Sequence, residues 1–319
     1  MDPSARRHAL KAHSRSTGLA AAVLGAAGFS IKAIFVKAAF RYGVDAETLL
    51  ALRMLYSLPL FLLMGLAATR SAAAPISGAD WRALALLGVL GYYAASYLDF
   101  LGLQYITASL ERVILFTYPT MVVFLTAWNV RRLPGRATWT ALLLTYAGVA
   151  LVVTHDLRSG GRDTVLGSAL VFASAVSYAF YLLRAGPLLG RLGPARVAAW
   201  GTTIACLLAL GQFMLLRPIA TIVAQPWQVQ ALGVAMAVFS TVLPVWFVTV
   251  AMRQLGAGPT AMIGALGPVI TLLLAWLVLG EALGTLQLLG AALVIYGVRI
   301  VAKASAGEAS EHPQPQQLR

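Results

Sequence analysis

Charged residues are scarce in this sequence. Only 11% of its 319 residues are Asp, Glu, Lys or Arg, whereas about 25% is usual in soluble domains. Hydrophobic residues make up 60%, and the mean hydropathy is +0.80. These values exclude an ordinary water-soluble enzyme and predict an all-α polytopic membrane protein. The chain is long enough for about ten helices of roughly 20 residues each.

Cysteine, histidine and catalytic motifs are scarce as well. The single cysteine, Cys206, lies in an apolar run and excludes an internal disulfide. The four histidines, His8, His13, His155 and His312, lie in tails or a loop, which argues against a metal or histidine catalyst inside the membrane. The chain has no HExxH motif, no P-loop and no Gly-x-Ser-x-Gly motif. We therefore expect no enzymatic activity, no cofactor and no metal site.

The net charge of +13 arises mostly between the apolar segments. There, basic residues act as topology signals, and we expect no nucleic-acid partner. With a cytoplasmic amino terminus, 16 Lys and Arg residues lie inside and 5 outside, while Lys32, Arg53 and Arg112 lie within spans. The positive-inside rule thus places both termini in the cytoplasm, and we expect a multi-pass protein of the inner membrane.

Ten apolar segments alternate with short polar ones. The first is too long for the apolar region of a signal peptide and is interpreted as a membrane helix. We expect disordered tails over 1–17 and 303–319. The ten predicted spans are 18–40, 46–68, 80–100, 107–128, 137–154, 165–184, 196–216, 229–250, 259–279 and 284–302.

An internal repeat connects the two halves of the chain. A shift of 149 residues places the fourth and fifth spans on the ninth and tenth without a gap, so that Pro119 meets Pro268 and Gly148 meets Gly297. Gly and Pro are informative because they mark backbone requirements that Leu and Val do not. Each repeat, 18–154 and 165–302, holds five spans. Since five is odd, the repeats should lie inverted, as in many secondary transporters with a midplane substrate site.

Several short motifs recur in a defined order across residues 18–302: Leu52-Arg53, ITASL at 106–110, Tyr118-Pro119, LGE at 279–281, Gly290 and Gly297-Val298. Through these motifs the sequence resembles the drug/metabolite transporter superfamily in its ten-helix, EamA-type branch of metabolite exporters. One departure is notable, because the family usually has a glutamate after the fourth span. Here the residue equivalent to Glu281 is Arg132, which argues against an acidic role shared by both halves.

Ionisable residues inside spans usually face a polar cavity or pair with each other. All of them belong to the first repeat: Lys32, Arg53, Asp99, Glu111 and Arg112. Asp99 and Arg112 lie at similar depth, so an ion pair is easily formed, whereas Glu111 and Arg112 point about 100° apart on a helix. Three interpretations stay open: a structural network between helices two to four, attraction of a substrate carboxylate, or a proton-coupling role for Glu111 or Asp99.

Aromatic residues form a second pattern. Tyr92, Ser96 and Asp99 have the spacing of one helix face and predict a polar stripe on a cavity wall. Cavity lining and helix packing are equally compatible with the other aromatics. Aromatic walls suit amphipathic organic solutes better than inorganic ions. These candidates are Tyr93, Tyr97, Tyr118, Tyr178, Tyr181 and Trp246.

Four prolines lie inside spans, and each removes a backbone donor: Pro59, Pro119, Pro244 and Pro268. They predict either a static bend or a gate hinge. The match of Pro119 to Pro268 across the repeat raises the weight of the hinge.

The whole pattern predicts a secondary transporter with a central cavity between two inverted repeats, working by alternating access. The resemblance implies export of an amino acid or related solute, and a carboxylate-bearing solute suits the excess of bases. The expected partners are the lipid bilayer, this solute and, if transport is coupled, protons. The alternatives are a channel-like facilitator or, less favoured, a lipid-handling membrane protein or a membrane enzyme.

Overall fold

The computed structural model describes residues 3–72, 74–129, 131, 135–255, 260, 263–264 and 266–311. These residues form helices and short connections, and no strand occurs among them. In chain order the helices are α1 (Pro3–Phe40), α2 (Ala46–Arg70), α3 (Gly78–Leu87), the π-helix η1 (Gly88–Ala94), α4 (Ala95–Leu103), α5 (Ala108–Leu115), α6 (Tyr118–Asn129), α7 (Arg136–Leu192), α8 (Pro194–Leu216), α9 (Ala220–Val223), α10 (Trp227–Ala237), the π-helix η2 (Val238–Val242), α11 (Leu243–Leu255), α13 (Gly267–Leu274), the π-helix η3 (Ala275–Leu279) and α14 (Thr285–Glu311).

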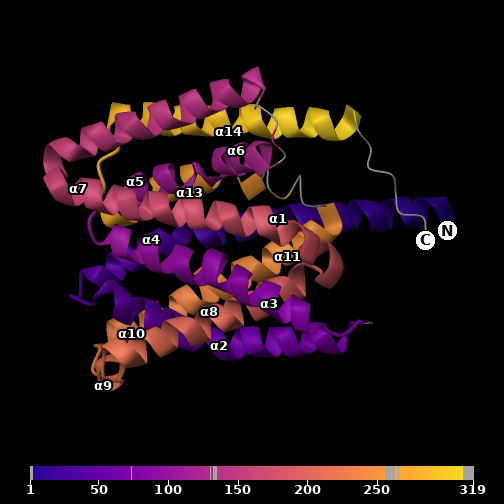
Figure 1. The fold of residues 1–319 in the computed structure, drawn as a ribbon, viewed down its shortest axis with the longest axis horizontal. Helices are drawn as coiled ribbons and strands as arrows, with labels where there is room; N and C mark the ends of the chain where they lie inside the picture. Colours follow the sequence, from indigo (N-terminus) through magenta and orange to yellow (C-terminus); the bar gives the residue numbers. More distant parts are fainter. Residues whose placement is uncertain are drawn as a thin grey trace.

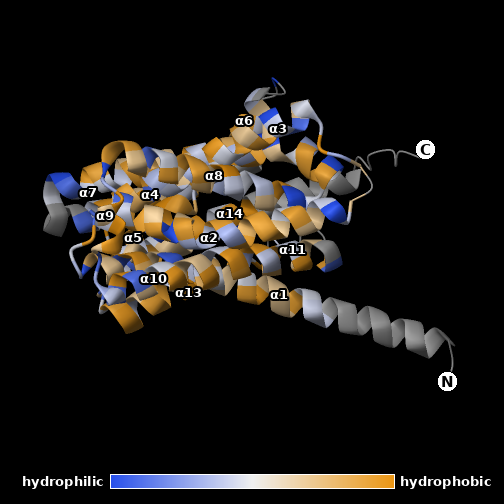
Figure 2. Ribbon diagram, turned by 90° about the horizontal axis from the view of Figure 1, so that it is seen from below, coloured by the Kyte–Doolittle hydropathy of each residue, from blue (hydrophilic) through white to orange (hydrophobic). Residues whose placement is uncertain are grey.

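The described helices overlap the predicted spans, and much of the first part of the predicted span 259–279 lies outside the described residues. Seven apolar helical segments are long enough to cross a bilayer, and three shorter ones accompany them. Figure 2 shows hydrophobic residues along the length of the bundle and hydrophilic residues mostly toward its two ends. The prediction of an all-α, multi-pass membrane protein is confirmed. The long segments are Ser16–Phe40, Ala46–Arg70, Gly78–Leu103, Ala108–Trp128, Gly161–Leu192, Pro194–Leu216 and Trp227–Met252, and the shorter ones are Trp139–Thr154, Gly267–Leu279 and Thr285–Ile300.

The structure differs from the prediction at three places. Helix α1 begins at Pro3 and α14 continues to Glu311, so both extend into segments predicted to be disordered. The predicted connection 155–164 lies within α7, which reverses direction at Gly161 (φ 55°, ψ −135°). Only glycine adopts this backbone conformation without strain. Figure 1 shows the reversal at the end of the molecule opposite both termini.

Close contacts between the repeats map onto each other under the 149-residue shift. A Cβ atom added at Gly148 would lie 2.6 Å from the carbonyl oxygen of Gly290. The shifted pair is Gly297 and Ala141, where the corresponding distance is 2.8 Å. The first arm of α7 therefore packs on α14 through two equivalent contacts, as the pseudo-two-fold axis of an inverted repeat requires.

A second pair of contacts that are equivalent under the 149-residue shift joins α1 to η2 and α7 to η1. A Cβ atom at Gly28 would lie 2.8 Å from the carbonyl oxygen of Phe239, so α1 packs closely on η2. Under the shift these positions become Ser177 and Leu90, and Ser177 Oγ donates to the Leu90 carbonyl at 2.8 Å. The second arm of α7 thus packs on η1 in the same way as α1 packs on η2. The predicted architecture of two inverted repeats is confirmed.

The helix breaks also recur in both repeats. Helix α5 ends at Leu115 and α6 begins at Tyr118, with Pro119 in its first turn. The equivalent break precedes α13, which begins at Gly267 and holds Pro268 at its start. Helices η1 and η2 occupy equivalent places, and Pro244 lies directly after η2. Because π-helices and broken spans have weakened backbone hydrogen bonding, they are the expected bending points of the bundle.

Candidate functional site

Four charged side chains from three helices meet inside the first repeat, and we call them the charged cluster: Lys32 on α1, Asp99 on α4, and Glu111 and Arg112 on α5. Lys32 Nζ lies 2.6 Å from Asp99 Oδ2 and 3.2 Å from Glu111 Oε1. Arg112 Nε lies 3.8 Å from Glu111 Oε2, while its Nη2 donates to the Phe29 carbonyl at 2.9 Å. Lys32 is therefore the bridge that holds the two carboxylates together.

This arrangement corrects two predictions about the charged residues. Asp99 pairs with Lys32 on α1 instead of the predicted Arg112, whose Nη2 donates to the Phe29 carbonyl of the same helix. Glu111 Oε2 and Arg112 Nε lie 3.8 Å apart although the two Cα–Cβ bonds point about 100° apart, because both side chains are long enough to meet beyond the helix backbone. The network also joins α1, α4 and α5, whereas helices two to four were expected.

The charged cluster is buried but retains unused hydrogen-bonding capacity. Glu111 is 0% exposed and Asp99 is 1% exposed. Within the described part of the chain, Asp99 Oδ1, Glu111 Oε2 and Arg112 Nε have no hydrogen-bond partner. An unsatisfied buried polar atom costs about 1–3 kcal/mol, and more when charged, so each of these atoms calls for a partner such as an ordered water, an ion or a solute. The cluster can both accept hydrogen bonds from a cationic group and donate to an anionic one.

Arg53 lies beside the charged cluster on α2. Its Nε donates to Thr241 Oγ1 at 2.9 Å, and its guanidinium carbon lies 5.4 Å from the centre of the Phe100 ring. It is also close enough to Asp99 to interact electrostatically. Arg53 therefore adds positive potential to the cluster while its own position is set by η2 and α4.

A second group, the tyrosine cluster, contains Tyr92, Tyr118, Tyr178 and Tyr181. Ring centres are 5.0 Å apart for Tyr118 and Tyr178, 5.4 Å for Tyr178 and Tyr181, and 5.3 Å for Tyr92 and Tyr181. The hydroxyls of Tyr92 and Tyr181 lie 3.1 Å apart. Tyr118 begins α6, directly after the helix α5 that carries Glu111 and Arg112, so the two clusters draw on consecutive helices.

The predicted polar stripe of Tyr92, Ser96 and Asp99 does not form. Tyr92 belongs to the tyrosine cluster, whereas Asp99 belongs to the charged cluster. The reason is η1, which ends at Ala94 between these residues. A π-helix inserts an extra residue into the turn, so the face expected from regular α-helical spacing is lost.

The other predicted aromatics lie apart from both clusters. Tyr93 stacks on Tyr97 with ring centres 6.2 Å apart. Their hydroxyls donate to Gln212 on α8 at 2.6 Å and to Glu47 on α2 at 3.2 Å, so the pair faces α2 and α8. Trp246 is 50% exposed on α11. These contacts fit helix packing for Tyr93 and Tyr97.

Glu281 is a polar residue whose contacts were not foreseen. Its Oε1 accepts from the Ala108 amide at 2.8 Å, and its Oε2 accepts from the Ser109 amide at 3.0 Å and from Ser109 Oγ at 2.6 Å. The LGE motif at 279–281 was the available signal. The sequence did not show that this glutamate reaches the other repeat.

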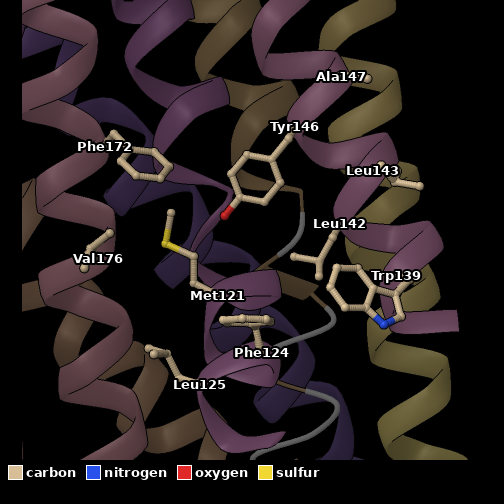
Figure 3. Close-up of a pocket in the computed structure, with 10 residues that line it drawn as sticks. All are labelled: Met121, Phe124, Leu125, Trp139, Leu142, Leu143, Tyr146, Ala147, Phe172 and Val176. Atoms are coloured by element: carbon tan, nitrogen blue, oxygen red, sulfur yellow. The ribbon is translucent and has the colours of Figure 1, made fainter. Parts of the chain in front are cut away.

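A separate apolar cavity of about 610 Å³ lies between α6 and the two arms of α7 (Figure 3). None of the predicted site residues lines it. In Figure 3 the Tyr146 hydroxyl points toward the space between Met121 and Phe172. The cavity is lined by Met121, Phe124, Leu125, Trp139, Leu142, Leu143, Tyr146, Ala147, Phe172 and Val176.

Comparison with known families agrees with the two-repeat geometry. The EamA-like transporter family model matches twice, at residues 16–154 and 165–303. The chain belongs to the EamA-like transporter family. This EamA-like protein is therefore a multi-pass membrane transporter, and the resemblance to the drug/metabolite transporter superfamily is confirmed.

The individual relatives of this EamA-like protein share about a quarter of its residues. "Uncharacterized transporter YcbK" of Bacillus subtilis (strain 168) is 28% identical over 292 residues, which cover 88% of this chain and 91% of YcbK. "Threonine/homoserine exporter RhtA" of Escherichia coli (strain K12) is 26% identical over 204 residues, covering 63% of this chain and 64% of RhtA. A solved structure titled "Crystal structure of protein" has a TM-score of 0.62 at 19% identity, covering 92% of this chain and 99% of that one. That last similarity supports the fold alone.

Proposed function

We propose that this transporter exports a small amino acid or a related solute by alternating access through a cavity between the two repeats. The main support is the charged cluster, in which Asp99 Oδ1, Glu111 Oε2 and Arg112 Nε have no hydrogen-bond partner among the described residues, while Glu111 Oε2 and Arg112 Nε form an ion pair at 3.8 Å. An amino acid carries an ammonium and a carboxylate on one carbon, so it suits both kinds of group. Threonine and homoserine are the first candidates, because RhtA is named for their export.

Each side chain of the cluster has a distinct role in this proposal. Asp99 and Glu111 attract the solute ammonium, and Arg112 attracts its carboxylate. Lys32 keeps the two carboxylates close without a solute, and Arg53 adds positive potential beside Asp99. The neighbouring Tyr118, Tyr178 and Tyr181 provide an aromatic wall for the solute side chain. Proton coupling through Glu111 or Asp99 is the second mechanism that this geometry supports, because the solute and a proton would compete for the same carboxylates.

The transport cycle also requires bending and a defined orientation. We place the repeats at 18–154 and 165–302, with bending at the breaks that hold Pro119 and Pro268 and after η2 at Pro244. We further propose an inner-membrane location with both termini in the cytoplasm. The excess of basic residues on that side supports this orientation, as does the position of both termini at one end of the bundle (Figure 1).

The test is efflux of radiolabelled threonine or homoserine from proteoliposomes that contain the purified protein. We expect flux from the wild type and at least a tenfold loss in Arg112→Ala and Glu111→Gln, because removal of one partner from a buried charged contact typically costs about 2–5 kcal/mol. Arg217→Ala is the matched control, since Arg217 also pairs with a glutamate, Glu47, at 3.5 Å, but at an exposed position.

Two results would contradict the proposal. Undiminished flux in both Arg112→Ala and Glu111→Gln would remove the charged cluster from the transport path. Absence of amino-acid flux, together with flux of another metabolite in an export screen, would replace the substrate class. Flux that does not respond to a proton gradient would exclude proton coupling and leave facilitated export.

A further inference from the structure

Glu281 joins the second repeat to the helix that carries half of the charged cluster. It follows Gly280, whose positive φ of 71° ends η3 and turns the chain toward α5. The carboxylate then accepts three hydrogen bonds from Ala108 and Ser109 at 2.6–3.0 Å. These residues are more than 170 positions away in the sequence, so this contact is made only when the two repeats are docked.

The first turn of α5 depends on this contact. A helix leaves its first backbone N–H groups without partners, and a carboxylate satisfies them well because of the helix dipole. Thr107 accepts from the Leu110 amide through Oγ1 and from the Glu111 amide through its carbonyl. The amides of Ala108 and Ser109 remain, and both donate to Glu281. The start of α5 is therefore completed by the other repeat.

Further hydrogen bonds join neighbouring helices at the same end of the molecule. Arg41 Nη2 donates to the Leu279 carbonyl at 2.8 Å, and Lys37 Nζ donates to the Leu103 carbonyl at 3.1 Å. Asp156 accepts from Thr107 Oγ1 at 3.3 Å and from Gln287 Nε2 at 3.1 Å. The ends of α1, α4 and η3, the start of α14 and the part of α7 just before its reversal are thus held together around the start of α5. This is the end opposite the two termini (Figure 1).

We propose that Glu281 is a latch: its carboxylate holds α5, and with it Glu111 and Arg112, in the conformation that is closed at this end, and it releases when this end opens. Glu111 lies only two residues after Ser109, so loss of the contact at the start of α5 is transmitted to Lys32 and Asp99. The residue equivalent to Glu281 in the first repeat is Arg132, so the latch is specific to one repeat. The proposal concerns the protein without solute and is independent of the substrate.

The decisive experiment is hydrogen–deuterium exchange of the full-length protein in lipid nanodiscs without solute, comparing wild type with Glu281→Gln. We expect exchange to rise about fivefold at 108–112, as for a lost helix cap, and also to rise at 29–40 and 96–103, which contact the cluster. Asp45→Asn is the matched control. Asp45 also caps a helix at this end, through Thr48 at 2.8 Å, but lies next to that helix in sequence. Its effect should stay within 45–50.

An increase confined to 108–110 would show a simple helix cap and overturn the latch, as would no increase at all. If Glu281→Gln does not fold, Ser109→Ala removes one of the three bonds and should produce a smaller increase over the same segments. An increase in exchange that is confined to 108–110 in Ser109→Ala would again count against the latch.

A second measurement fixes the latch shut. In a Cys206→Ala background, Ser109→Cys and Glu281→Cys are joined by a short bis-methanethiosulfonate, which forms a disulfide with each thiol, releases methanesulfinate and can be cleaved by a reductant. We expect near-complete loss of flux that is restored by a reductant, whereas unchanged flux after cross-linking would refute the latch. If threonine and homoserine are not substrates, the exchange experiment still decides the question, so failure of the latch is distinguishable from failure of the proposed function.

Discussion

The charged cluster and the tyrosine cluster share equivalent positions but differ in chemistry. Under the 149-residue shift, Lys32 on α1 corresponds to Tyr181 on α7, and Phe29 corresponds to Tyr178. One repeat therefore places a partly buried cation where the other places a phenol. The charged cluster lies in the first repeat alone, whereas the tyrosine cluster draws on both, since Tyr92 and Tyr118 belong to the first.

A polar contact next to the clusters shows the same relation. Arg53 donates to Thr241 at 2.9 Å. The shifted positions are Thr202 and Tyr92, but Thr202 Oγ1 has no hydrogen-bond partner among the described residues. This polar contact is thus made in one repeat and not at the equivalent place of the other. We conclude that the architecture is symmetric and the recognition chemistry is not, which suits a solute with one charged end and one less polar end.

The largest expected effect comes from removing the bridging cation. Lys32→Ala leaves Asp99 and Glu111 buried side by side without their shared partner, which should lower the free energy of unfolding by about 3–5 kcal/mol. Thermal unfolding of the detergent-solubilised protein measures this. The triple variant with Asp99→Asn and Glu111→Gln should recover most of the loss. An unchanged melting temperature in Lys32→Ala would mean that the cluster is not a coupled ionic unit.

An intermediate effect is expected at the pair Gly28 and Ser177, which are equivalent positions. Gly28→Ala places a Cβ 2.8 Å from the Phe239 carbonyl, and overpacking of this kind typically costs about 1–3 kcal/mol. Ser177→Ala only removes the hydrogen bond to Leu90, which is worth about 0.5–1.5 kcal/mol. Unfolding of both variants under the same conditions tests this order. Equal losses of stability in the two variants would show that the helices can shift to accommodate a Cβ at Gly28, so that this contact is not as close as the structure indicates.

The smallest effect is expected in the tyrosine cluster. Tyr92→Phe removes the 3.1 Å contact with the Tyr181 hydroxyl while it keeps the ring in place. The free energy of unfolding should fall by no more than about 1 kcal/mol, and flux of the labelled amino acid should stay near that of the wild type. A loss of flux as large as that of Arg112→Ala would make the phenols part of an ionic or proton path and remove the contrast between the clusters.

Several features of the fold were predictable because they depend on local composition. Apolar length located the spans, and the matched prolines indicated the repeat whose breaks lie before Tyr118 and Gly267. The candidate site was predictable only as a set of residues. Its pairing was not, since Lys32 was named without its role as a bridge, and η1 separates Tyr92 from Asp99 by a change of helical phase that hydropathy does not report.

The sequence by itself therefore determined the class of protein, the number of spans and the inverted repeat. The physical reason is that burial in a bilayer demands long apolar helices, while glycine and proline mark their close contacts and breaks. Only the tertiary structure decided which charges meet and that Glu281 completes α5 from the other repeat. Such contacts depend on helix rotation and on the direction of long side chains between segments far apart in the chain.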